Sequence, residues 1–146
     1  MSLRVLLAVD GSQHALRAVE HVLRLRAAGC MIDVHLLNVQ MPLDTGHVRM
    51  FIARESLDEH YREEGRAALQ DASALLERAG QEFTAHIAVG NAAEAIARYA
   101  AEMGFDLVVM GTHGRTGLRH VVMGSVARDV LRLSRVPVTV IRSLVD

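Results

Sequence analysis

Hydrophobic residues follow two alternating patterns along the chain. Short apolar runs of about four to eight residues alternate with longer stretches in which apolar residues recur every three or four positions. A short run is typical of a buried strand, and the longer period is typical of a helix with one buried face. The runs predict strands at Leu3–Val9, Ile32–Val39, Phe83–Val89, Leu107–Met110 and Val138–Ile141.

The stretches between these runs predict four helices. Ser12 is a good N-cap for the first helix, which ends near Gly29. The others are predicted at Val48–Ala79, Ala92–Met103 and Gly124–Leu133. Because strands interleaved with helices form βαβ units, we expect an α/β fold with one doubly wound, five-stranded parallel sheet and helices on both faces. A length of 146 residues suits one domain spanning residues 1–146.

Composition narrows the partners that this domain could take. Aromatic residues make up only 3% of the chain, so the core is expected to be aliphatic, which suits a parallel sheet covered on both faces. The 16 basic and 17 acidic residues give a net charge of −1, so neither nucleic acid nor a membrane is an expected partner. All basic residues are arginine, and the absence of lysine excludes a Walker A phosphate loop.

Cys30 is the only cysteine, which excludes an internal disulfide and suggests a reducing compartment. We expect it to be a small buried residue near the start of a strand. No apolar run reaches the length of a membrane span, and the amino-terminal residues lack a signal-peptide core. A cytoplasmic protein is therefore expected.

The loop after the fourth strand carries the strongest chemical signal. Ligands of doubly wound sheets bind beyond the carboxyl ends of the strands, near the point where the strand order reverses. Between Gly111 and Gly124, four glycines fall within fourteen residues, and Gly124 and Ser125 then open a helix. Backbone N–H groups in such a loop, together with the helix N-terminus, can hold a phosphate, and Arg115 or Arg119 could add charge. Alternatively, these glycines serve only as turns.

The glycine spacing resembles a known signature. The pattern Gly111-x2-Gly114-x9-Gly124-Ser125 is similar to the ATP-binding motif of the universal stress protein family. The likeness extends over nearly the whole chain and includes Val5–Ser12, Leu37–Val39 and Arg135–Ile141. It implies an adenine nucleotide alpha hydrolase-like fold and a regulator that holds ATP, with Mg²⁺, in the Gly111–Ser125 loop.

The resemblance also implies roles for individual residues. Asp10 is expected beside the adenosine part of the ligand, and the backbone of Val39 at the edge of the adenine ring. Ribose and phosphates are expected among Gly111, Gly114, Gly124 and Ser125. The remaining candidate binding residues are Ala8, Met110, His113, Arg115 and Val126. Asp10 has a second interpretation, since its carboxylate could simply accept hydrogen bonds within the Asp10–Ser12 turn.

Other functions are weaker alternatives. The chain has no G-x-S-x-G elbow, its first turn is not G-x-G-x-x-G, and none of its eight histidines forms an H-x-x-x-H pair that would suggest a metal site. We therefore expect no catalytic residues and no protein-held metal. A slow ATPase or an adenylyl-transferring enzyme remains an alternative, with His113 as the only candidate base, and so does a module that binds no nucleotide.

The last predicted strand, Val138–Ile141, suggests self-association. An exposed edge strand can pair with a second copy of itself. Members of the resembled family also commonly dimerise through this strand. We therefore expect a homodimer, with an ordinary unpaired edge strand as the alternative.

Overall fold

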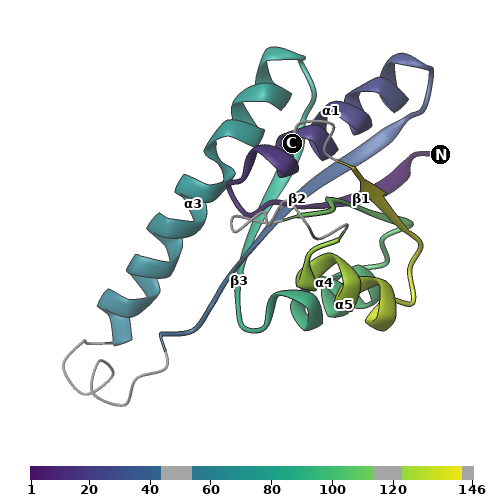
Figure 1. The fold of residues 1–146 in the computed structure, drawn as a ribbon. Coiled ribbons are helices and arrows are strands. Elements are labelled where there is room, and N and C mark those ends of the chain that lie inside the picture. The colour runs from purple at the N-terminus through teal and green to yellow at the C-terminus, as the bar shows by residue number, and fades with distance from the viewer. Residues whose placement is uncertain (44–53, 114–122, 143–146) are drawn as a thin grey trace.

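The computed structural model describes residues 1–43, 54–113 and 123–142, which form an open parallel sheet with helices on both faces (Figure 1). The strands lie in the order β3-β2-β1-β4-β5 and all pairs are parallel. The strands are β1 (Leu3–Ala8), β2 (Ile32–Gln40), β3 (Phe83–Val89), β4 (Leu107–Gly111) and β5 (Val138–Ile141). The helices are α1 (Gln13–Ala27), α3 (Arg54–Arg78), α4 (Ala92–Glu102) and α5 (Ser125–Leu133).

The predicted fold class and the alternation of elements are confirmed. Strand and helix ends differ from the predictions by one or two residues: β1 ends one residue before Val9, and β2 continues to Gln40. The predicted helix from Val48 is observed from Arg54 onward as α3, because residues 44–53 lie outside the described ranges. Within those ranges, no helix combines the length and the apolar character that a membrane span needs.

β1 is the central strand of the sheet. It pairs with β2 through Leu7 opposite Leu36, and with β4 through Leu6 opposite Val108. Leu6 and Leu7 are both fully buried because the two faces of the sheet are covered by different helices. Helices α1 and α3 pack on the face that carries Leu7, and α4 and α5 pack on the face that carries Leu6.

The prediction that Cys30 is buried is wrong, because its side chain is exposed. Cys30 lies in the reversal between α1 and β2, directly after Gly29, whose φ of 110° is in the region that glycine favours. Its amide donates to the carbonyl of Leu25 over 3.1 Å, which closes the end of the helix. The backbone of Cys30 therefore belongs to the turn rather than to the buried part of β2.

A histidine pair links the edge strand β3 to β2. The rings of His35 and His86 stack with centroids 5.1 Å apart, and His35 Nδ1 lies 2.8 Å from His86 Nε2. His35 Nε2 lies 3.3 Å from a carboxylate oxygen of Asp33, and Tyr99 of α4 packs edge-on against His86. Burial, followed by the charges of His35 and Arg4, lowers the pKa of His86 below its ordinary value of 6.5.

This lowered pKa predicts how stability depends on pH. Below pH 6.5 the unfolded chain takes up a proton that the folded protein resists, so the free energy of unfolding falls on acidification until the pKa of folded His86 is passed. Substituting His86→Gln keeps a side chain that can hydrogen-bond toward His35 but removes the titrating group. The melting temperature of this variant should therefore fall less between pH 7.5 and 5.5 than that of the wild type.

The matched control is His60→Gln, which changes an exposed histidine on α3. It should retain the pH dependence of the wild type. If the melting temperatures of His86→Gln and the wild type changed equally with pH, His86 would not be the group responsible.

Candidate functional site

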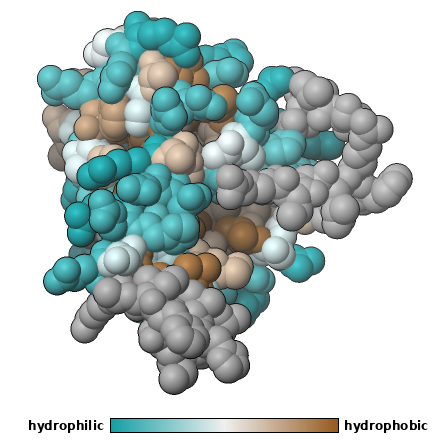
Figure 2. All heavy atoms as spheres, turned by 90° about the vertical axis from the view of Figure 1, so that its left-hand side faces the viewer, coloured by the Kyte–Doolittle hydropathy of each residue, from teal (hydrophilic) through white to brown (hydrophobic). Residues whose placement is uncertain are grey.

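A cavity of about 360 Å³ lies at the carboxyl ends of β1, β2 and β4, where the strand order reverses. The starts of α1, α4 and α5 complete its wall through Ala15, Ala92 and Ser125. The face of the molecule seen from the left of Figure 1 carries these strand ends, and hydrophobic atoms gather near its middle (Figure 2). A mainly apolar hollow with a few polar groups is typical of a small-molecule site.

Asp10 lies in the turn after β1 and lines the cavity. Its Oδ1 accepts a hydrogen bond from the amide of Ser12 over 2.9 Å, so the turn interaction is present. Gly11 occupies the middle of this turn with φ of 86°, and a Cβ there would lie 3.4 Å from the Cα of Ala68 on α3. The turn thereby holds the carboxylate of Asp10 in the wall of the cavity.

The end of β2 presents backbone groups toward the cavity. Backbone N–H and C=O groups of successive strand residues point to alternate sides. The carbonyl of Leu37 accepts from Val9, on the β1 side, and that of Gln40 accepts from Gly90, on the β3 side. Val39 therefore directs its N–H and C=O to the β1 side, beyond the last residue of β1.

The glycine-rich loop is closed at its base. The amide of Gly124 donates to the carbonyl of Thr112 over 2.6 Å, and the amide of Thr112 donates to the carbonyl of Ile141 over 3.0 Å. The Oγ1 of Thr112 also lies 3.1 Å from Nδ1 of His113. The Thr112 end of the loop is thus hydrogen-bonded to β5, and the Gly124 end is hydrogen-bonded to Thr112.

Helix α5 begins at the cavity without a side chain to cap it. Ser12 caps α1 and Asn91 caps α4, each through a side-chain oxygen that accepts a backbone N–H. In α5, which is described along its whole length, the cap residue Gly124 offers no such oxygen and the first turn contains no acidic residue. Gly124, Ser125 and Val126 line the cavity, so the positive end of the helix dipole opens into it.

Every predicted binding residue that the structure describes lines this one cavity: Ala8, Asp10, Val39, Met110, Gly111, His113, Gly124, Ser125 and Val126. The predicted residues Gly114 and Arg115 lie outside the described ranges. Sequence reasoning missed other lining residues: Val9, Ala15, Leu37, Asn38, Met41, Ala92, Ile96, Thr112 and Ala127. Of these, Asn38 had a detectable signal, because it is a polar residue inside an apolar strand.

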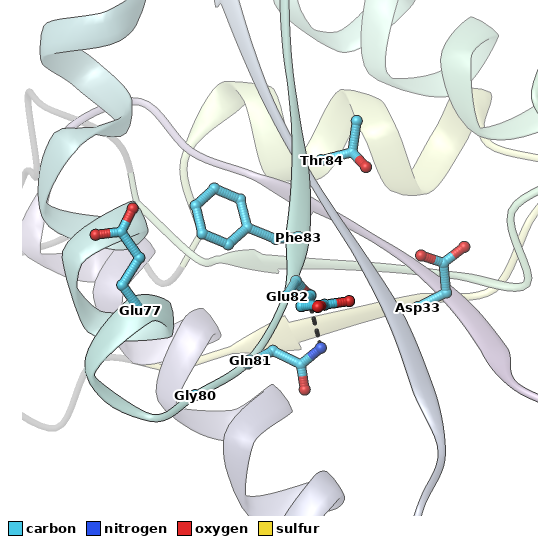
Figure 3. Close-up of a pocket in the computed structure, with 7 residues that line it drawn as sticks. All are labelled: Asp33, Glu77, Gly80, Gln81, Glu82, Phe83 and Thr84. Carbon is cyan, nitrogen blue, oxygen red and sulfur yellow. Dashed lines mark hydrogen bonds between the residues drawn. The ribbon is translucent and has the colours of Figure 1, made fainter.

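A second hollow, of about 710 Å³, lies at the opposite ends of β2 and β3 (Figure 3). Its carboxylates belong to Asp33, Glu77 and Glu82. Asp33 and Thr84 lie to one side of β3, while Glu77 and Phe83 lie to the other, so the polar groups do not converge (Figure 3). Negative charge and this divergence make it a poor place for a phosphorylated ligand.

The described residues contain no group of three histidine, cysteine, aspartate or glutamate side chains placed to share a metal ion. The titratable side chains that line the cavity at the carboxyl ends of β1, β2 and β4, among the described residues, are those of Asp10 and His113. The arrangement is therefore suited to holding a ligand by backbone groups and apolar contact.

Gly111 is needed where β4 passes α1. A Cβ at this position would lie 2.8 Å from the carbonyl oxygen of His14, and neither backbone can yield cheaply. We expect Gly111→Ala to lower the free energy of unfolding by about 1–3 kcal/mol, measured by urea denaturation. A loss well below about 1 kcal/mol would contradict the requirement for glycine at this position.

Comparison with known proteins gives a consistent assignment. The family model described as the universal stress protein family matches residues 1–142. Universal stress protein MJ0531 of Methanocaldococcus jannaschii is 29% identical over 95% of this chain and 81% of its own length. Universal stress protein Slr1230 of Synechocystis is 42% identical over 52% of this chain, which corresponds to only 26% of that relative.

Solved structures show the same fold. The M. jannaschii protein MJ0577 superposes with a TM-score of 0.82 at 29% identity, covering 100% of this chain and 99% of its own. A universal stress protein from Archaeoglobus fulgidus, solved in complex with dAMP, has a TM-score of 0.63 at 25% identity, with 96% and 97% coverage. An Arabidopsis thaliana protein solved with AMP bound has a similar fold, with a TM-score of 0.69 at 20% identity and 99% and 94% coverage.

Proposed function

Because this chain belongs to the universal stress protein family, we propose that its strand-end cavity binds an adenine nucleotide, ATP with Mg²⁺, and that the protein is a cytoplasmic, nucleotide-responsive regulator. One observation carries the proposal. The backbone edge of Val39 and the uncapped start of α5 open into the same apolar cavity. A nucleotide needs one binding partner for its base and another for its phosphates. The similar universal stress protein from A. fulgidus was solved in complex with dAMP.

The base would lie against β2. Adenine presents an amino donor beside a ring-nitrogen acceptor, which matches the C=O and N–H that Val39 directs toward the cavity. Ile96 and Met110 supply apolar contact from α4 and β4. Burying the ring faces against such side chains contributes favourable free energy, and the backbone edge selects the base.

The phosphates would lie at the start of α5. Unsatisfied N–H groups of the first turn, with the hydroxyl of Ser125, favour an anion. Asp10 would repel phosphates, so its carboxylate is better placed against ribose hydroxyls. Mg²⁺ would be held mainly by phosphate oxygens and water, because Asp10 is the only carboxylate among the described lining residues.

A holding role is favoured over fast catalysis. With Asp10 placed against the ribose, His113 is the candidate general base among the described lining residues, and it lies beside the Thr112 hydroxyl. Its place in the cavity makes slow ATP hydrolysis a second candidate activity. Bound nucleotide would stabilise the folded state by mass action, which provides a direct readout.

A charge substitution at α5 tests the phosphate site. We expect ATP to raise the melting temperature of the wild type and to bind measurably by titration calorimetry. Ser125→Asp should weaken ATP binding at least about tenfold, because it places a carboxylate where phosphates would bind. The same carboxylate favours the helix dipole, so the free variant should melt no lower than the wild type.

The matched control is Ser56→Asp, an exposed position near the start of α3 and outside the cavity. Its affinity for ATP should equal that of the wild type. Unchanged affinity in Ser125→Asp would refute the phosphate site, and no binding of any adenine nucleotide at millimolar concentration would refute the proposed function.

We also propose that the protein forms a homodimer through β5. This strand is an edge of the described sheet, and its four residues Val138–Ile141 are only half-buried. Leu131 and Leu133, at the end of α5, are 44% and 37% exposed beside it. An unpaired ladder next to exposed leucines is suited to pairing with a second copy.

The backbone of Val140 offers a selective test. Pro137 and Ile141 direct their carbonyls to the β4 side, so by alternation Val140 directs its N–H outward. Val140→Pro removes that donor and leaves the β4 pairing in place. Sedimentation of the wild type should give twice the chain mass of 16.0 kDa, and Val140→Pro should give the single mass. A wild type that sediments only at 16.0 kDa would contradict the dimer.

A further inference from the structure

Asn38 is a buried polar residue at the end of β2, with 3% of its surface exposed. Its Nδ2 donates to the carbonyl of Val9 over 2.8 Å, and its Oδ1 accepts from Nε2 of Gln40 over 2.6 Å. Both contacts lie beside the strand-end cavity, which Asn38 and Val9 help to line. Burying an asparagine amide costs free energy unless its polar atoms are hydrogen-bonded, and these two contacts satisfy both ends of the amide.

The orientation of this amide is fixed by chemistry. A backbone carbonyl can only accept hydrogen bonds, so the group that faces Val9 must be the NH₂ of Asn38. The oxygen of Asn38 is then left for Gln40, whose NH₂ donates to it. Neither amide can be turned around without placing two acceptors against each other.

The acceptor that Asn38 occupies is the next position of the β1–β2 ladder. Cα pairing of the two strands ends at Ala8 and Leu37, and the amide of Val9 then donates to the carbonyl of Leu37 over 2.9 Å. In a continuing parallel ladder, the N–H of Val39 would donate to the carbonyl of Val9. The side chain of Asn38 donates to that carbonyl, and the backbone hydrogen bonds of the described residues outside regular helices and strands include none from Val39 to Val9.

We propose that Asn38 is a positioning residue that ends the β1–β2 ladder and so keeps the N–H and C=O of Val39 available to a base of adenine type. This inference rests on the proposed nucleotide site, and it identifies the residue that allows that site to distinguish adenine from other bases. Adenine matches the Val39 edge with an amino donor and a ring-nitrogen acceptor. Hypoxanthine presents a carbonyl and a ring N–H at the same positions, so acceptor would face acceptor and donor would face donor.

Removing the donor of Asn38 should let the strands pair one step further. The carbonyl of Val9 would lose its partner and would capture the N–H of Val39, since a buried carbonyl without a hydrogen bond is costly. The N–H of Val39 would then be used within the sheet, and only its C=O would remain to contact the base. The ratio of the affinities for adenine and hypoxanthine nucleotides should fall, while the contribution of the phosphates bound at α5 should not change.

The experiment compares ATP with inosine triphosphate by titration calorimetry. Both ligands carry the same triphosphate, so a change of charge in the protein cancels in the ratio of their affinities. The wild type should prefer ATP by at least about tenfold, and Asn38→Asp and Asn38→Leu should lower this ratio at least about threefold, because the C=O of Val39 still faces the base. The control is Asn91→Asp, which makes the same chemical change at the cap of α4, outside the cavity lining, and should keep the wild-type ratio.

Amide hydrogen exchange at Val39 in nucleotide-free protein is the second readout. Val39 should exchange rapidly in the wild type and slowly in Asn38→Leu, where the ladder is extended. A wild-type Val39 that is already protected, or an Asn38 variant that folds and keeps the ATP preference, would overturn the inference. Failure of the wild type to bind either triphosphate would refute the proposed function instead. If both variants fail to fold, Asn38→Ala and Asn38→Ser take their place, and a protected Val39 in the wild type still overturns the inference.

Discussion

The parallel pairing of β1 with both β2 and β4 is the constraint on which the rest of the structure depends. After β1 the chain continues to β2 and β3 on one side of β1, whereas β4 and β5 lie on its other side. The segments that follow β1 and β4 therefore run in opposite directions along the sheet and leave a gap between them. Leu6 and Leu7 are fully buried on opposite faces, which requires helices on both. Those helices begin where the strands end, and the cavity is the space that remains between them.

Some polar groups around this cavity already have hydrogen-bond partners within the protein and stabilise the fold. Others, among the described residues, lack a partner within their own helix or strand and are available to a ligand. The carboxylate of Asp10 holds its own turn, and Thr112 fastens the glycine-rich loop to β5. Asn38 occupies the carbonyl of Val9. The first turn of α5 lacks a capping side chain, in contrast to α1 and α4. Backbone donors left at a cavity wall are best satisfied by a bound anion.

Most of the fold could be predicted from the sequence, because short apolar runs and helical periods alternate regularly. The family assignment from the glycine spacing is also confirmed, whereas its ATP-binding character stays a prediction. The exposure of Cys30 could not be predicted, since it depends on how the turn after Gly29 closes onto α1. The contact of Asn38 with the carbonyl of Val9, where β1 has ended, joins residues 29 positions apart, and no local pattern records it.

The central claim is that the cavity at the carboxyl ends of β1, β2 and β4 holds an adenine nucleotide. A crystal structure of the protein grown with saturating ATP and Mg²⁺ tests it most directly. Density for the base is expected against the backbone of Val39, and density for the phosphates at the start of α5. Nucleotide density in the acidic hollow beside Glu77 and Glu82, or a strand-end cavity without nucleotide, would contradict it.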